Sequence, residues 1–160
     1  MPDTKAISCD STLTVNGGTI NLTISGAQSK GLKSGKAMTF NGGSITATIS
    51  GIAVLTASGS GYDPSYCTAI KGDADIVING GNISITSTSN ANGAKGISAD
   101  GNITVNGGII SITTAGNGGV YTNTSGTTDS YTAACIKSDA NISLLGGHIT
   151  CISTGTGGKC

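Results

Sequence analysis

The sequence of 160 residues contains no Arg, no Glu and no Trp, and it has a single Phe. Its charges are eight Lys and eight Asp, so the net charge at pH 7 is zero. Zero net charge from so few ionisable groups argues against a nucleic-acid partner or an anionic membrane surface. No run of about 18 apolar residues occurs, so no segment is predicted to span a bilayer.

The missing residue types also restrict catalysis and secondary structure. Without Glu, glycoside hydrolysis would have to rely on pairs of Asp, and we therefore expect a binding protein, not an enzyme. The single His, His148, has no second His or Cys at metal-binding spacing. No stretch shows the apolar period of a helix, so the sequence predicts essentially no helix.

Gly, in contrast, is abundant, with 27 residues, and much of it occurs in one repeated motif. The triplet Asn-Gly-Gly starts at Asn16, Asn41, Asn79 and Asn106, and a fifth copy reads Leu145-Gly146-Gly147. Each copy lies between two short runs in which apolar and polar residues alternate, as in LTVNGGTINLTI. Repetition at intervals of about 25 residues is typical of a solenoid, in which each repeat is one coil of the chain.

Aligning the copies gives the length of each coil, called a rung here. The rungs start near residues 5, 30, 68, 95 and 134, and a sixth starts at Lys159. Their lengths are 25, 38, 27, 39 and 25 residues. In this alignment Cys160 takes the position of Cys135, one rung further on, where a disulfide would be within reach.

Apolar residues form five columns in the alignment. The alternation around them has period two, which predicts strands with one buried face. The columns are Ile7, Leu32, Ile70, Ile97, Ile136; Leu13, Met38, Ile76, Ile103, Ile142; Val15, Phe40, Ile78, Val105, Leu144; Ile20, Ile45, Ile83, Ile110, Ile149; and Leu22, Ala47, Ile85, Ile112, Cys151. The sequence therefore predicts one all-β domain over residues 1–160, a single-stranded parallel β-helix with about five rungs of three short strands. A right-handed coil is expected, because parallel crossovers prefer that hand.

The two longer rungs carry their extra residues at the same corner, in loops over residues 51–66 and 116–133. Because the corner is shared, both loops should project from one edge of the solenoid. All four Tyr of the chain lie in these loops, and a sugar ring is typically bound by an aromatic face together with polar groups. The predicted carbohydrate-binding residues are Tyr62, Asp63, Tyr66, Tyr121, Asn123, Asp129 and Tyr131. The alternative is that these tyrosines fold back and shield the edge.

The units KGISADGNITVNGGIISITT and KAISCDSTLTVNGGTINLTIS resemble the repeats of a family of bacterial secreted carbohydrate-binding β-helix domains, similar in shape to pectate lyases. The resemblance covers all five rungs. It implies polysaccharide binding, of acidic or cellulosic glycans, together with bound calcium and an extracellular or cell-surface location. The chain itself shows no apolar signal segment near its N-terminus.

The resemblance fails at one position of the repeat. Where the family has Asp before Gly-Ile, this chain has Lys30 and Lys95. A later column keeps Asp73, Asp100 and Asp139, and these are the candidate calcium ligands. The alternative is that they cap their own turns and pair with Lys33, Lys71 and Lys137.

Two further functions are consistent with a solenoid of this kind. The open ends expose unpaired strands, so copies could stack head to tail into an extracellular fibre. The outward positions of the third strand form an array of hydroxyl groups, such as Thr46 and Thr48, which could order water and bind ice. Both are kept as alternatives to carbohydrate binding.

Overall fold

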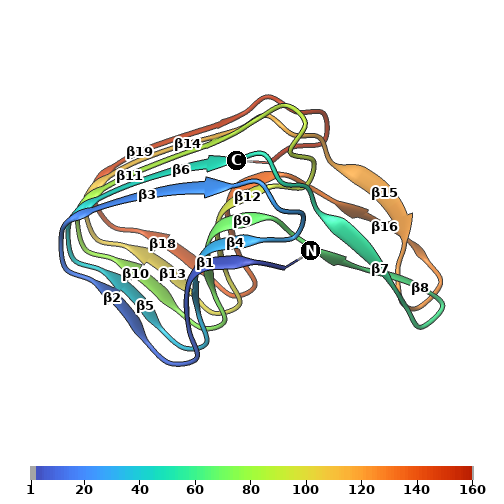
Figure 1. The fold of residues 1–160 in the computed structure, drawn as a ribbon, viewed down its shortest axis with the longest axis horizontal. Helices are drawn as coiled ribbons and strands as arrows, with labels where there is room; N and C mark the ends of the chain where they lie inside the picture. The colour runs from blue at the N-terminus through green and yellow to red at the C-terminus, as the bar shows by residue number, and fades with distance from the viewer. Residues whose placement is uncertain (1–2, 160) are drawn as a thin grey trace.

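The computed structural model describes residues 3–159, and within that range it contains strands and no helix. Each rung contributes one strand to each of three parallel five-stranded sheets, which enclose a common core (Figure 1). No helix long and apolar enough to cross a membrane occurs in residues 3–159. Cys160, for which a disulfide partner was considered, lies outside the described residues.

The three sheets are named A, B and C in the order in which each rung passes through them. Sheet A contains β1 (Lys5–Cys9), β4 (Lys30–Ser34), β9 (Thr68–Gly72), β12 (Lys95–Ala99) and β17 (Ala134–Ser138). Sheet B contains β2 (Leu13–Val15), β5 (Met38–Phe40), β10 (Ile76–Ile78), β13 (Ile103–Val105) and β18 (Ile142–Leu144). Sheet C contains β3 (Thr19–Ile24), β6 (Ser44–Ile49), β11 (Asn82–Ser87), β14 (Ile109–Thr114) and β19 (His148–Ser153).

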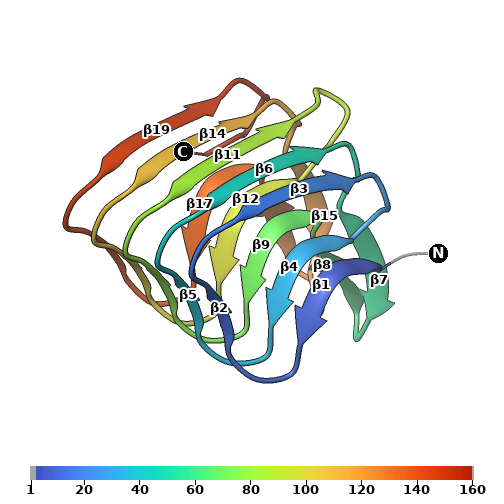
Figure 2. The ribbon, with the colours of Figure 1, turned by 60° about the vertical axis from the view of Figure 1, so that its left-hand side comes forward.

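The register of the sheets pairs the residues that stand first in successive rungs of the repeat. Lys30 pairs with Lys5 and with Thr68, and Lys95 pairs with Thr68 and with Ala134. An isolated bridge between Ala134 and Lys159 begins the sixth rung. Equivalent residues therefore lie above one another, and Figure 2 shows the five coils stacked side by side from blue to red.

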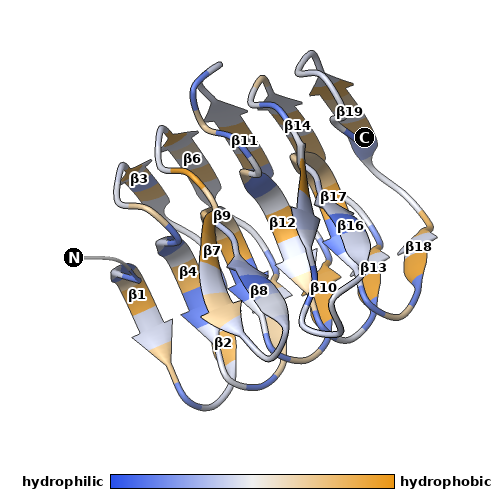
Figure 3. Ribbon diagram, turned by 90° about the vertical axis from the view of Figure 1, so that its right-hand side faces the viewer, coloured by the Kyte–Doolittle hydropathy of each residue, from blue (hydrophilic) through white to orange (hydrophobic). Residues whose placement is uncertain are grey.

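The apolar columns form continuous files in the core. In the middle rungs these side chains are fully buried, as Ile76 and Ile103 are. In the outer rungs the same files reach solvent at Ile7, Ile142 and Leu144, and Figure 3 shows the apolar strand β18 at one end of the stack. Head-to-tail association through these ends stays a prediction.

The Asn-Gly-Gly corners are held by backbone conformation and by a ladder of amides. The second glycine of each motif has a positive φ, such as 86° at Gly18 and 95° at Gly81, which residues with a Cβ rarely adopt. Along the stack each Asn side chain donates to the Asn of the preceding rung: Asn41 to Asn16 at 2.7 Å, and then Asn79 to Asn41 and Asn106 to Asn79 at 2.8 Å. The ladder ends there because the last rung has Leu145 in the position of the Asn.

Removing the middle of this ladder should cost stability. Asn79→Ala eliminates two amide hydrogen bonds, and we expect the free energy of unfolding to fall by about 1–2 kcal/mol. Urea denaturation of purified protein measures it. Asn82→Ala, at an exposed position three residues along the chain and outside the ladder, is the matched control. Equal losses in the two variants would contradict a stabilising ladder.

Sheet C presents its polar side chains outward in register. Thr23, Thr48, Thr86 and Thr113 occupy successive positions of one column. The hydroxyl array expected from the sequence is therefore present, with Ile152 in the last position. Ice binding on this face stays a prediction. Thermal hysteresis in cold solutions of the protein would support it.

Candidate functional site

The two insertions form one projecting feature, although each is more ordered than the loops expected from the sequence. Residues 51–66 contain the antiparallel hairpin of β7 (Val54–Ser58) and β8 (Gly61–Ser65), and residues 116–133 contain that of β15 (Gly119–Thr122) and β16 (Thr128–Tyr131). Figure 1 shows both hairpins on the same side of the solenoid. The predicted common edge is confirmed.

The hairpins also contact each other. Tyr62 of β8 forms a parallel bridge with Asn123, and the Ser60 N–H donates to the Thr124 carbonyl at 2.9 Å. The four strands β7, β8, β15 and β16 are called the hairpin arm below. In Figure 3 the arm stands in front of sheet A.

Asn123, predicted as a sugar contact, closes the second hairpin. Its Oδ1 accepts hydrogen bonds from the Ser125 N–H at 3.0 Å and from the N–H and hydroxyl of Thr127 at 3.1 and 3.0 Å. Asn commonly organises turns in this way. Its oxygen is therefore committed to the turn, and its amide NH₂ is the group that could meet a ligand.

Tyr121 and Tyr131 form an aromatic pair on the second hairpin. Their ring centroids are 6.4 Å apart with planes inclined by 47°. The Tyr121 hydroxyl donates to Asp129 Oδ2 at 3.3 Å, because these residues face each other across the hairpin. Tyr131 packs over Gly119, where an added Cβ would lie 2.7 Å from the ring. Tyr131 therefore has a packing role, Tyr121 is half-buried, and Asp129 is exposed.

The first hairpin contributes Tyr62, Asp63 and Tyr66. Tyr62 is 45% exposed, and Asp63 is exposed beside it. Burial first, and then the charges of Tyr121, Asp129 and Asp63, raise the pKa of Tyr66 to about 12. These side chains are therefore near enough to interact electrostatically across the arm, although they come from two separate insertions.

Tyr66 turns toward sheet A and contacts a lysine. The Lys95 ammonium lies 3.1 Å from the centroid of the Tyr66 ring, a cation–π arrangement. A pocket of about 170 Å³ opens at this point between the first hairpin and sheet A. Its lining includes Tyr66, Lys95, Lys30 and Lys71. The sequence alone does not reveal this pocket, although Lys recurs at the first position of several rungs.

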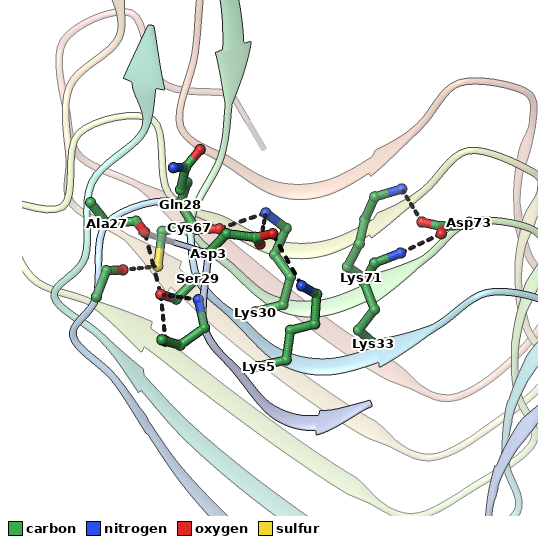
Figure 4. Close-up of polar contacts among 12 residues, drawn as sticks. Asp3, Lys5, Ala27, Gln28, Ser29, Lys30, Lys33, Cys67, Lys71 and Asp73 are labelled. Carbon is green, nitrogen blue, oxygen red and sulfur yellow. Dashed lines mark hydrogen bonds and ion pairs between the residues drawn. The ribbon is translucent and has the colours of Figure 1, made fainter. Parts of the chain in front are cut away.

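The outer face of sheet A carries most of the cations of the protein. Six of the eight lysines lie on its strands: Lys5, Lys30, Lys33, Lys71, Lys95 and Lys137. Figure 4 shows part of this row with its acidic partners Asp3 and Asp73. A chain with zero net charge therefore has a locally cationic surface beside the hairpin arm.

The candidate calcium ligands are partnered by this row. Lys33 and Lys71 both pair with Asp73, Lys71 also pairs with Asp100, and Lys137 pairs with Asp139. A hydrogen bond from Lys137 keeps the pKa of Asp139 below its ordinary value.

These partners do not fit a calcium site. Calcium needs six to eight oxygen ligands, whereas each carboxylate here contacts an ammonium. In residues 3–159 no three His, Cys, Asp or Glu side chains are grouped to hold a metal. The donor set fits the alternative in which the aspartates pair with lysines.

A family model described as carbohydrate-binding domain-containing protein matches residues 2–118, which comprise the first four rungs through β14 together with the first hairpin. Searches of curated proteins and of solved structures give no match.

Proposed function

Because this chain belongs to the family of carbohydrate-binding domain-containing proteins, we propose that it is a non-catalytic module that binds a polysaccharide along the hairpin arm and the neighbouring face of sheet A. The observation that carries the proposal is the joining of two insertions, far apart in the sequence, into one arm through the Tyr62–Asn123 bridge. The proposal includes an extracellular or cell-surface location, where polysaccharides are exposed.

The arm offers the two kinds of group that a sugar requires. The face of an aromatic ring covers the C–H side of a pyranose, and carboxylate and hydroxyl groups meet its hydroxyls. Tyr62 offers an exposed aromatic ring. Tyr121 and Asp129 together offer an aromatic ring and polar groups. The rigid coils below hold these side chains, so little conformational entropy is lost when a glycan binds.

Alanine substitution of the exposed Tyr62 and of the half-buried Tyr121 tests the site. We expect Tyr62→Ala and Tyr121→Ala each to weaken binding to a glycan that the wild-type protein retains by about tenfold, the effect of losing one aromatic contact of about 1.4 kcal/mol. Affinity electrophoresis in gels containing soluble polysaccharides measures this. Tyr121→Phe keeps the ring and should retain most of the affinity.

Leu145→Ala is the control for this experiment. Leu145 is exposed and apolar, but it lies at the Asn-Gly-Gly corner between sheets B and C and not on the hairpin arm. Its loss should leave glycan binding unchanged. Wild-type affinity in both tyrosine-to-alanine variants would move the binding site away from the arm.

A further inference from the structure

One lysine of sheet A differs from its neighbours in having no acidic partner. Lys5 pairs with Asp3 at 3.1 Å, and Lys30 contacts the same carboxylate at 3.7 Å. Lys33, Lys71 and Lys137 pair with aspartates as described above. Within residues 3–159, Lys95 forms no ion pair and is only 5% exposed. A buried ammonium without an anion is energetically costly, and the Tyr66 ring offsets only part of this cost.

The pocket beside Lys95 is suited to an anionic group. Lys30 and Lys71 line it with Lys95, and the hydroxyl-bearing residues Ser65, Thr68 and Ser98 complete the polar wall. No acidic residue is among its lining residues. Its volume of about 170 Å³ equals that of about six water molecules in the liquid, enough for one charged substituent but not for a length of polysaccharide.

On the basis of the proposed function, we propose that this pocket receives an anionic substituent of the bound glycan, a carboxylate or a sulfate ester, directly on its lysine ammonium groups. Lys95 is the residue that selects a charged glycan over an uncharged one, and recognition requires no calcium. A carboxylate or sulfate on Lys95 would supply the missing counter-ion, and the pocket hydroxyls can donate to its remaining oxygens.

The position of the lysines explains why calcium is unnecessary. Lys30 and Lys95 occupy the position at which the family resemblance leads one to expect Asp. The aspartates that remain in sheet A are already paired with lysines. The ammonium groups of Lys30 and Lys95 therefore lie where a calcium-dependent site would need carboxylate ligands.

The charge of Lys95 should make this recognition depend on pH. Burial, together with the nearby charges of Lys137 and Lys71, lowers the pKa of Lys95 from 10.5 to about 7, against the opposing effect of Asp139 and Asp100. The facing Tyr66, with its pKa near 12, remains neutral. Lys95 is thus charged below about pH 7 and neutral above it, whereas a uronic carboxylate stays ionised from about pH 5 upward. Binding should weaken as the pH rises through about 7.

The experiment compares charged and uncharged forms of one polymer. Binding of polygalacturonate, its methyl ester and dextran sulfate is measured by isothermal titration calorimetry at pH 6 and pH 8, with and without EDTA. We expect at least one of the two acidic polymers to bind about tenfold tighter at pH 6, the ratio of charged Lys95 at the two pH values. EDTA should have no effect, and the preferred acidic polymer distinguishes carboxylate from sulfate.

Variants identify the responsible residue. Lys95→Met keeps the length of the side chain without its charge, and it should abolish the pH dependence and the preference for acidic polymers. Lys36→Met removes an exposed lysine outside the pocket and should change neither.

The possible failures are distinguishable. Loss of binding in EDTA, or a failure of both acidic polymers to bind more tightly than the methyl ester, would overturn the inference and leave the proposed function intact. A protein that binds neither charged nor neutral polysaccharides would overturn both. The urea midpoint of Lys95→Met shows whether this variant folds. If it does not fold, Lys95→Arg is used in its place. Arg keeps its charge at every pH, so Lys95→Arg should bind acidic polymers equally well at pH 6 and pH 8.

Discussion

Ile110→Ala is expected to lower the free energy of unfolding by about 2–5 kcal/mol, the range for large-to-small changes in a closed core. Ile110 is completely buried in the file between Ile83 and Ile149. Because the rungs above and below are fixed by backbone hydrogen bonds, the core cannot collapse around the missing methyl and methylene groups. The loss should therefore approach the upper part of that range.

The neighbouring residue provides the control for this measurement. Ile109 belongs to the same strand, but it points outward and is 54% exposed. Ile109→Ala should change the free energy of unfolding by less than about 0.5 kcal/mol. Urea denaturation followed by circular dichroism compares the two variants under identical conditions. Equal destabilisation would mean that the alternation of inward and outward residues in this strand is incorrect.

Gly116→Ala is expected to destabilise the protein by about 3 kcal/mol or more, or to prevent folding. An added Cβ at this corner would overlap the carbonyl group of Ala91 in the rung below and would lie 2.9 Å from the Asn92 nitrogen. These are backbone atoms, so they cannot rotate away as a side chain can. Relief would require the two rungs to separate locally, which breaks the corner on which the second hairpin is built.

Gly17→Ala is the matched control for Gly116→Ala. Gly17 also lies at a corner, but no atom is within 4 Å of the position of its Cβ. Alanine there should be neutral or stabilise by about 0.4–1 kcal/mol, because it restricts the unfolded chain. Thermal unfolding of both variants is the measurement. A similar melting temperature for the two proteins would contradict the close stacking of the corner at Gly116.

The architecture of the coil was predictable because neighbouring rungs repeat it residue by residue. Columns such as Leu13, Met38 and Ile76 are visible in the alignment, and each is a register pair in sheet B. Their register is unchanged by the two insertions. The sequence therefore contained both the strand positions and their partners, which is rarely true of a fold without repeats.

The form of the insertions was not predictable in the same way. Residues 51–66 and 116–133 were expected to be loops, since Gly, Ser and Thr dominate them and no regular alternation is visible. Their hairpins depend on each other: the hydrogen bond from Ser60 to Thr124 joins segments that no local pattern connects. Only the common edge, which follows from the rung alignment, could be deduced.

The candidate site was predictable only where it follows from the alignment of the rungs. The alignment located the tyrosines and the acidic residues on one edge, but it could not assign Asn123 to its turn. It also could not show that Tyr66 covers Lys95, because that contact requires the first hairpin to return across the outer face of sheet A. The alignment thus showed that Lys95 stands at a repeated position, but it did not show the surroundings of Lys95 in the folded protein.

The corner from which the hairpins project has a consequence for how such modules diversify. Rung two reaches Thr68 in register after 38 residues, whereas rung one reaches Lys30 after 25. The coil thus tolerates an excursion of variable length at this point without any change in strand pairing. Hairpins could be exchanged there as cassettes, and ligand preference could change by recombination while the scaffold keeps its stability.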